Sequence, residues 1–176
     1  LRGGGRFWDW CTYDSRLVAE VGAWASENGA VVMTRAEAGP PRGSAGRFEV
    51  DVTDRLEGDV ATVRAKSVIA AVGPWSDSYR MASDPNTKAR ARLTSGIHLI
   101  VPRVMNEHAI IANARSDGRV FFLLPFFDRT LIGTTDRDVT GDPRTLTIED
   151  RDVDYLIEEA NAVLSDRPLA REDVIS

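Results

Sequence analysis

The most constraining feature of this 176-residue chain is a series of short β-type segments followed by one helical pattern. Strand-type hydrophobic residues occupy residues 96–101, 109–112, 119–124 and 130–134. The pairs Asp117-Gly118 and Asp128-Arg129 separate consecutive segments, as turns do between antiparallel strands. At residues 148–164 apolar residues recur at helical spacing. These features predict an antiparallel sheet that is followed in the chain by one helix.

The first half of the chain alternates between helical and strand patterns. Apolar residues recur at helical spacing from Asp14 until Gly29, where a glycine favours the left-handed helix stop. The expected strands are a β-branched run at residues 30–34, an alternating pattern at 48–53, a second strand around 60–63 and a continuous apolar run at 67–72. This mixture predicts an α/β (α+β) fold rather than a helical bundle or a sandwich.

A breaker stretch at residues 83–88, rich in polar residues and proline, separates these two halves. We therefore predict two domains. Residues 1–82 contain a helix, a strand, a β-meander and a buried strand, and residues 83–176 contain the antiparallel sheet and the last helix. The chain starts with Leu1 rather than Met and has no signal peptide, so we expect a fragment of a longer protein.

Charge and composition argue against several classes of function. The net charge of -5 and a pI near 5.1 make a broad nucleic-acid or anionic-membrane surface unexpected. The single cysteine, Cys11, excludes an internal disulfide, and two histidines leave little material for a metal centre. The longest apolar run, residues 120–127, is too short to span a bilayer. We expect neither a metal nor a nucleic-acid partner.

Three local strings carry candidate chemistry, and each also has a purely structural interpretation. The string Ala-Ala-Val-Gly-Pro-Trp at residues 70–75 either admits a ligand to its backbone or only permits close helix packing. His98 lies on an expected strand, where a histidine is more often a hydrogen-bonded core residue than a proton acceptor. The Gly-Thr-Thr-Asp string at residues 133–136 either belongs to a site or caps the backbone locally.

Taken in order, these strings and several others resemble the family of FAD-dependent (aerobic) glycerol-3-phosphate dehydrogenases. The matching segments are residues 14–18, 70–75, 96–103, 119–125, 131–136, 141–143, 152–156 and 171–176. The ordered series covers nearly the whole chain and is more specific than any single motif. The resemblance implies part of an FAD-binding Rossmann-like domain with a β-meander in residues 1–82, and an antiparallel-sheet substrate (cap) domain in residues 83–176.

The resemblance also implies an activity. Enzymes of this family oxidise sn-glycerol 3-phosphate to dihydroxyacetone phosphate with FAD and pass the electrons to a quinone. A cytoplasmic protein that can associate peripherally with the inner face of a membrane is implied as well. The family carries a GxGxxG segment before the part that this chain covers, and substrate-binding arginines after it. We therefore expect the chain alone to be inactive.

Site residues follow from the same resemblance. His98 matches the family histidine that faces the substrate, where a base can accept the C2 hydroxyl proton while hydride passes to the flavin. The positions implied to bind FAD are Glu37, Ala38, Ala71, Val72, Gly73 and Trp75.

The chain departs from the family pattern near these residues. Ala70 and Val72 stand where the family has polar side chains, and Ser95 stands where it has a lysine. Phe126 stands where a tryptophan is usual. These departures leave two alternatives open: another amine- or hydroxyacid-oxidising flavoenzyme of the same fold, or a non-catalytic remnant that serves as a binding domain.

Overall fold

The computed structural model describes residues 3–105, 107–164 and 168–176. The chain forms two compact units, Leu1–Arg90 (unit 1) and Ala91–Ser176 (unit 2). The backbone N–H of Arg90 donates a hydrogen bond to the Asp77 carboxylate (2.7 Å), which ties the end of unit 1 to the rest of that unit. The two compact units divide after Arg90, whereas we predicted a domain boundary after residue 82.

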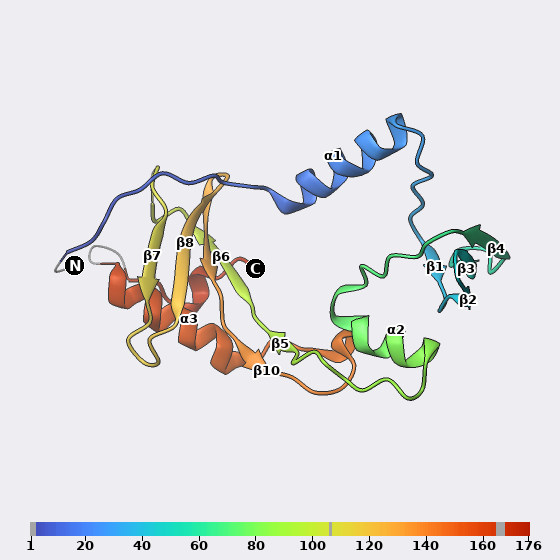
Figure 1. The fold of residues 1–176 in the computed structure, drawn as a ribbon. Helices are drawn as coiled ribbons and strands as arrows, with labels where there is room; N and C mark the ends of the chain where they lie inside the picture. The colour runs from blue at the N-terminus through green and yellow to red at the C-terminus, as the bar shows by residue number, and fades with distance from the viewer. Residues whose placement is uncertain (1–2, 106, 165–167) are drawn as a thin grey trace. The chain divides into compact units, whose positions relative to one another are not determined.

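Unit 1 contains two helices and a small antiparallel sheet (Figure 1). The helices are α1 (Asp14–Glu27) and α2 (Ser76–Ser83), and a 3-10 turn, η1 (Gly73–Trp75), precedes α2. The strands are β1 (Ala36–Ala38), β2 (Arg42–Ser44), β3 (Arg47–Asp54) and β4 (Val60–Ala65). Strand β3 pairs with β4 on one side and with β2 and then β1 on the other. The predicted first helix, the alternating strand and its partner are confirmed.

Two predicted strands of unit 1 are wrong. Residues 30–34 and 67–72 adopt no strand structure, and Val31 and Ile69 within them are 83% and 89% exposed. A strand needs a neighbour that satisfies its backbone N–H and C=O groups. No described strand of unit 1 pairs with either run. The short helix α2 was not predicted, because it spans only eight residues and most of them are polar, too few for a helical pattern to be recognised.

Unit 2 is built on a four-stranded antiparallel sheet with a helix against one face (Figure 1). The sheet strands are β6 (His98–Pro102), β7 (Ile110–Asn113), β8 (Val120–Phe126) and β9 (Arg129–Gly133), in the order β6-β9-β8-β7. The helix is α3 (Asp150–Val163). Outside this sheet lie a ladder of β5 (Thr94–Ser95) with β10 (Arg137–Asp138) and two 3-10 turns, η2 (Pro143–Thr145) and η3 (Arg171–Asp173). The predicted strands and helix of this half are confirmed.

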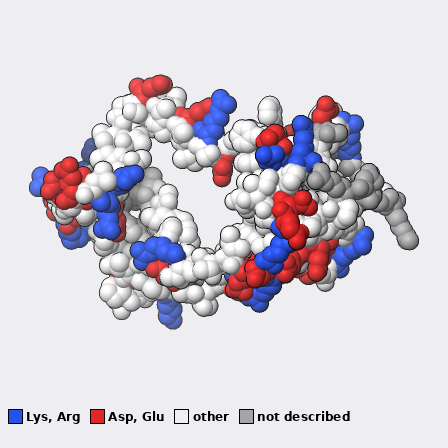
Figure 2. All heavy atoms as spheres, turned by 180° about the vertical axis from the view of Figure 1, so that it is seen from behind, with Lys and Arg blue, Asp and Glu red and all other residues white. Residues whose placement is uncertain are grey.

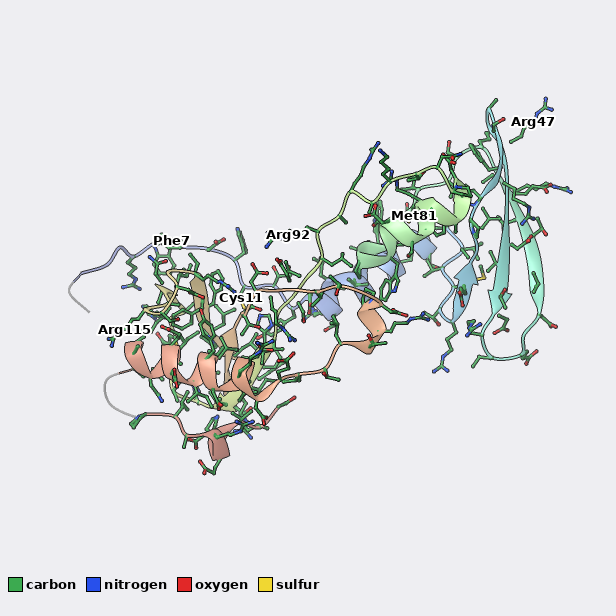
Figure 3. All side chains as sticks on the ribbon, turned by 90° about the horizontal axis from the view of Figure 1, so that it is seen from below. Phe7, Cys11, Arg47, Met81, Arg92 and Arg115 are labelled. Carbon is green, nitrogen blue, oxygen red and sulfur yellow. The ribbon has the colours of Figure 1, made fainter. Side chains whose placement is uncertain are left out.

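The core of unit 2 lies between the sheet and α3. Alternate residues of the sheet strands are buried on this face: Leu99, Val101, Phe121, Leu123 and Ile132. Leu156 and Ala160 of α3 pack into the same cluster and are fully buried. Figure 3 shows side chains crowded between α3 and the sheet. Among the described residues of unit 1, only Val50 is a buried hydrophobic residue.

A buried carboxylate joins α3 to the turn between β7 and β8. Glu159 is 6% exposed and accepts hydrogen bonds from the backbone N–H groups of Arg115 (2.5 Å) and Ser116 (3.0 Å). Burial by itself would raise the pKa of Glu159, but the hydrogen bonds from Ser116 and Arg115 lower it below its ordinary value. The carboxylate therefore stays ionised and holds the turn against the helix.

Candidate functional site

The face of the unit 2 sheet that does not contact α3 is largely apolar. Directly opposite residues on antiparallel strands share a face, and the register aligns Ile100, Leu131 and Leu124 in one row across β6, β9 and β8. These three side chains are half-buried. Among the strand residues that share this face, His98 and Arg129 are the ionisable ones. We refer to this surface as the open face.

His98 lies at the end of β6, in the row next to that apolar row. It faces Gly133 of β9, and Gly133 in turn faces Phe122 of β8. The His98 side chain is exposed, and within the described part of the chain no hydrogen bond reaches either ring nitrogen. The alternative interpretation of His98 as a hydrogen-bonded core residue does not hold, because His98 points to the open face and not to α3. Its nitrogens are free to meet a ligand.

The segment that leads into His98 is fixed to the end of β9. The backbone N–H of Ile97 donates to the Thr135 hydroxyl (3.0 Å), and Thr135 is buried. A Cβ atom on Gly96 would lie 2.3 Å from the Thr135 carbonyl oxygen, so only glycine fits this close backbone contact. The Thr134 hydroxyl donates to the Thr135 carbonyl (2.9 Å). The threonines thus cap backbone groups, and they do so next to His98.

In unit 1 the predicted cofactor residues 71–75 form a turn before α2. Ala71 and Val72 have no regular structure, and Gly73 and Trp75 are the ends of η1. Gly73 has a φ of 53°, in the left-handed region, and a Cβ there would meet nothing within 4 Å. The Trp75 side chain is 43% exposed. The backbone around Gly73 is therefore open to close approach by a ligand.

The other two predicted cofactor residues lie on β1. Glu37 forms an exposed ion pair with Arg55 (3.2 Å), and Ala38 ends the strand. The Tyr79 hydroxyl of α2 donates to the carbonyl of Gly39 (3.0 Å), the residue after Ala38. Because α2 directly follows Trp75, this hydrogen bond connects both groups of predicted residues within unit 1.

Sequence reasoning missed the residues that hold these positions. Gly133 carried a usable signal, since a lone glycine in an apolar strand pattern indicates close approach of another group. Thr135 was considered within residues 133–136, either as part of a site or as a local cap, but its partner Ile97 was not predicted. Tyr79 had no signal, because its acceptor lies 40 positions earlier in the chain.

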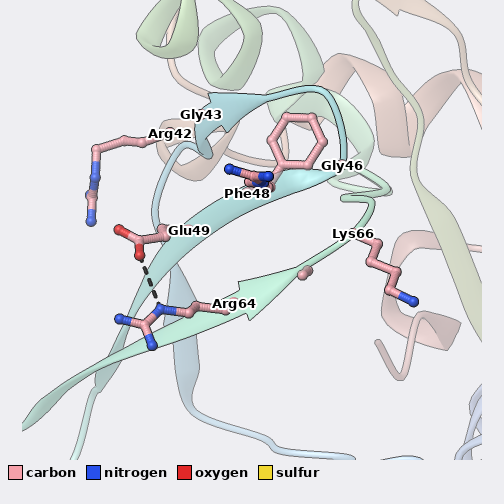
Figure 4. A pocket seen from close by; sticks show the side chains of 9 residues that line it. Arg42, Gly43, Gly46, Phe48, Glu49, Arg64 and Lys66 are labelled. Atoms are coloured by element: carbon pink, nitrogen blue, oxygen red, sulfur yellow. Dashed lines mark hydrogen bonds and ion pairs between the residues drawn. The ribbon is translucent and has the colours of Figure 1, made fainter.

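A second candidate is a basic depression of about 520 Å³ at the end of the β-meander (Figure 4). Four cationic side chains line it: Arg42, Arg47, Arg64 and Lys66. Arg64 pairs with Glu49 across the strands (3.1 Å).

Arg42 donates to both oxygens of Asp51 (2.6 and 2.8 Å), and the Thr62 hydroxyl donates to the same carboxylate (2.8 Å). The hydrogen bonds from Arg42 and Thr62 lower the pKa of Asp51 to about 2. Two of the four cations are thus neutralised by neighbouring strands. The depression is better explained as a cross-strand charge ladder than as an anion site.

Charges elsewhere are mixed. On the face drawn in Figure 2, acidic and basic side chains are interspersed rather than gathered by sign. In the described ranges no group of three or more His, Cys, Asp or Glu side chains is placed to hold a metal ion. None of the described helices is both long enough and apolar enough to cross a bilayer.

A family model and the curated relatives of the chain agree with one another. The protein-family model described as FAD dependent oxidoreductase matches residues 1–176. The chain is 35% identical over 179 residues to a glycerol-3-phosphate dehydrogenase of Pseudomonas aeruginosa, covering 99% of this chain and 34% of the relative. It is 33% identical over 180 residues to an alpha-glycerophosphate oxidase of Enterococcus casseliflavus, covering 99% of this chain and 30% of the relative.

A solved structure is similar as well. The glycerol-3-phosphate dehydrogenase from Bacillus halodurans complexed with FAD superposes with a TM-score of 0.84 at 31% identity, covering 93% of this chain and 34% of that one. The predicted fold class is thereby confirmed. The chain spans about a third of the length of the relatives that it matches.

Proposed function

The chain belongs to the FAD-dependent oxidoreductase family, and we propose that it is the central part of an enzyme that oxidises sn-glycerol 3-phosphate to dihydroxyacetone phosphate. Relatives at 31–35% identity across nearly the whole chain are named glycerol-3-phosphate dehydrogenases, and another at 33% an alpha-glycerophosphate oxidase. The observation that carries the proposal is the exposed His98 imidazole, which has no hydrogen-bond partner among the described residues and lies beside an apolar row.

Residues of unit 1 fit the role of holding FAD. Gly73 leaves its backbone open to close approach, with no atom within 4 Å of a potential Cβ. Among the described strands β1 pairs with β3 alone, so within this part of the chain Glu37 and Ala38 lie on a strand edge with backbone groups available to a ligand. Ala71, Val72 and Trp75 complete the proposed FAD-binding set. When bound, FAD supplies the two-electron acceptor for the oxidation.

His98 is the proposed proton acceptor. Oxidation of a secondary alcohol to a ketone breaks the hydroxyl O–H bond, and a neutral imidazole nitrogen within hydrogen-bond reach can accept that proton. The neighbouring Ile100, Leu131 and Leu124 offer no competing donor or acceptor side chain. The imidazole is therefore the group on this part of the open face that can orient a hydroxyl.

The complete enzyme is proposed to pass its electrons to a quinone and to associate peripherally with the inner, cytoplasmic face of a membrane. Both proposals rest on the family resemblance. Unit 1 is proposed as part of the FAD domain, and unit 2 as most of the substrate domain.

Ser95 favours a second candidate, an enzyme that oxidises an amine or a hydroxyacid. It replaces the family lysine, and the cation opposite to it, Arg137, is paired with Glu149 and Asp152. Arg137 is thus not free to take the place of the missing charge at a substrate phosphate.

The test is substrate-dependent flavin reduction by the longer flavoprotein that we propose contains this chain. Glycerol 3-phosphate should bleach the flavin, and amino acids and 2-hydroxy acids should not. His98→Ala should lower kcat by about 10²–10⁴-fold, whereas His108→Ala, a change at an exposed histidine outside the sheet, should leave it unchanged. Faster reduction by an amino or hydroxy acid, or equal effects of the two histidine variants, would contradict the proposal.

A further inference from the structure

The row across the open face that contains His98 has a gap in its middle. His98 of β6 and Phe122 of β8 both lie opposite Gly133 of β9, and these three positions share a face. Since Gly133 carries no side chain, the space above it is available to one of its two neighbours.

The His98 imidazole fills that space. A Cβ atom on Gly133 would lie 2.2 Å from Cδ2, 2.7 Å from Nε2 and 2.8 Å from Cγ of His98. These distances are far shorter than a non-bonded contact between heavy atoms. Gly133 itself is buried although His98 is exposed. The imidazole therefore lies on the backbone of Gly133.

A left-handed backbone does not explain the glycine at this position, because Gly133 is not among the glycines with positive φ. The three nearest atoms to its potential Cβ all belong to the His98 ring. Gly96 differs in this respect, since a Cβ there would meet the backbone of Thr135. A methyl group on Gly133 would thus first meet the His98 ring, which must move to admit it.

No hydrogen bond within the described chain sets the orientation of the imidazole. Neither ring nitrogen has a hydrogen-bond partner among the described residues, although the preceding amide, of Ile97, is held by Thr135. The backbone of His98 is thus fixed by β6, and its side chain packs on Gly133.

We propose that Gly133 is a positioning residue for His98: the absence of a side chain at Gly133 is what allows the imidazole to lie across β9 with its nitrogens presented on the open face. This inference rests on the proposed function for its catalytic meaning. It adds the residue that determines where the proposed proton acceptor is held.

The first test concerns geometry and uses the full 176-residue chain without cofactor or substrate. NMR should show a nuclear Overhauser effect between the His98 ring proton on Cδ2 and the Gly133 α-protons. Gly133→Ala should shift the ring resonances of His98 and leave the amide resonances of α3 in place. The control Gly22→Ala adds a methyl that meets nothing within 4 Å and should leave the ring resonances unchanged. Unchanged ring resonances in Gly133→Ala would overturn the inference.

The second test uses the longer flavoprotein with glycerol 3-phosphate. Gly133→Ala should lower kcat by about 100-fold, as expected for a small displacement of a reacting group, with flavin content and KM little changed. In a His98→Ala background the same substitution should have no further effect, because residues that act through one another are not additive. Gly22→Ala should match the wild type.

The outcomes separate the two proposals. If the wild-type flavoprotein does not turn over glycerol 3-phosphate, the proposed function fails, and the NMR comparison alone decides whether Gly133 positions the imidazole. If it does turn over and Gly133→Ala lowers kcat equally with and without His98, Gly133 acts independently of His98 and the inference is overturned.

Discussion

Each unit contains a 14-residue helix with an apolar stripe, and only one of the two helices buries it. In α1 of unit 1, Leu17 and Trp24 are 50% and 65% exposed. In α3 of unit 2, Leu156 and Ala160 are fully buried against the sheet. Helical periodicity therefore suffices to specify a helix in both places. Burial requires a complementary surface, which the described chain provides for α3 alone.

The two sheets differ in the same way. In the β-meander of unit 1, ion pairs such as Arg42–Asp51 and Arg64–Glu49 connect neighbouring strands, and the side chains of these pairs are solvent-exposed. Figure 3 shows the Arg47 side chain projecting outward from this meander. Exposed pairs contribute little to stability, whereas a shared core contributes much. Unit 2 should therefore be the more stable unit, and three experiments test this difference.

The largest effect is expected from removing matched leucines of the two helices. Leu156→Ala should cost about 2–5 kcal/mol of the unfolding free energy of unit 2, because it leaves a cavity in a close-packed core. Leu17→Ala should change stability by no more than about 0.5 kcal/mol, since its side chain is already half-exposed. Amide hydrogen exchange can be measured separately for α1 and for β6–β9. In each variant it therefore reports the unfolding free energy of unit 1 and of unit 2. Equal losses of stability in the two variants would contradict the inference that only α3 is stabilised by a packed core.

A smaller effect is expected at the buried carboxylate of unit 2. Glu159→Gln should destabilise unit 2 by about 1–3 kcal/mol, because two backbone N–H groups lose their charged acceptor. The pKa of Glu159 is lowered in the folded state. The stabilisation of unit 2 by ionised Glu159 is therefore fully present above the pKa of this group in the unfolded chain, and it is lost as the pH falls through the pKa in the folded state.

The acid sensitivity of unit 2 tests whether stability is lost in this direction of pH. Urea unfolding from neutral to acidic pH should show a steeper loss of stability for the wild type than for Glu159→Gln. The exposed neighbour Glu158→Gln serves as the control and should follow the wild type. If the stability of Glu159→Gln fell with pH as steeply as that of the wild type, the Glu159 carboxylate would not be the group responsible for the acid sensitivity.

The smallest effect is expected in the charge ladder of unit 1. The pKa of Asp51 is about 2 in the folded state and near 3.9 in the unfolded chain. Ionised Asp51 therefore stabilises the folded state above about pH 3.9, and this stabilisation disappears as the pH falls toward 2. Carbon-13 NMR of the carboxyl group should give a titration midpoint near 2, and Asp51→Asn should slightly increase hydrogen exchange in β3 and β4. A midpoint near 4 would mean that Arg42 and Thr62 do not hold this carboxylate in solution.

The sequence patterns predicted the elements of unit 2 well. Strands β7, β8 and β9 follow the predicted segments to within a few residues, because these consecutive strands pair through short turns. Strand β6 and helix α3 also follow their predicted segments, although β6 pairs with the more distant β9. Residues 30–34 and 67–72 have equally good strand composition, yet they remain unpaired. Composition indicates that a run is suited to a buried strand, but it does not supply the neighbouring strands.

The candidate site was predicted only in part. The resemblance led to His98, and the residues alone favoured a core histidine. Which face His98 occupies depends on the register of β6 against β9, and a shift of one residue would turn it toward α3. That Gly133 lies beneath the imidazole follows from the same register, which joins positions far apart in the chain.

The amino-acid sequence by itself determined the local elements of this protein, because apolar periodicity and turn residues act over a few neighbouring positions. It also carried the ordered series of motifs through which the family resemblance was first seen. Only the tertiary structure decided which apolar stripes are buried and which side chain lies over Gly133. Both depend on strand pairing between distant segments, whose free energy comes from packing and backbone hydrogen bonds that no short stretch of sequence contains.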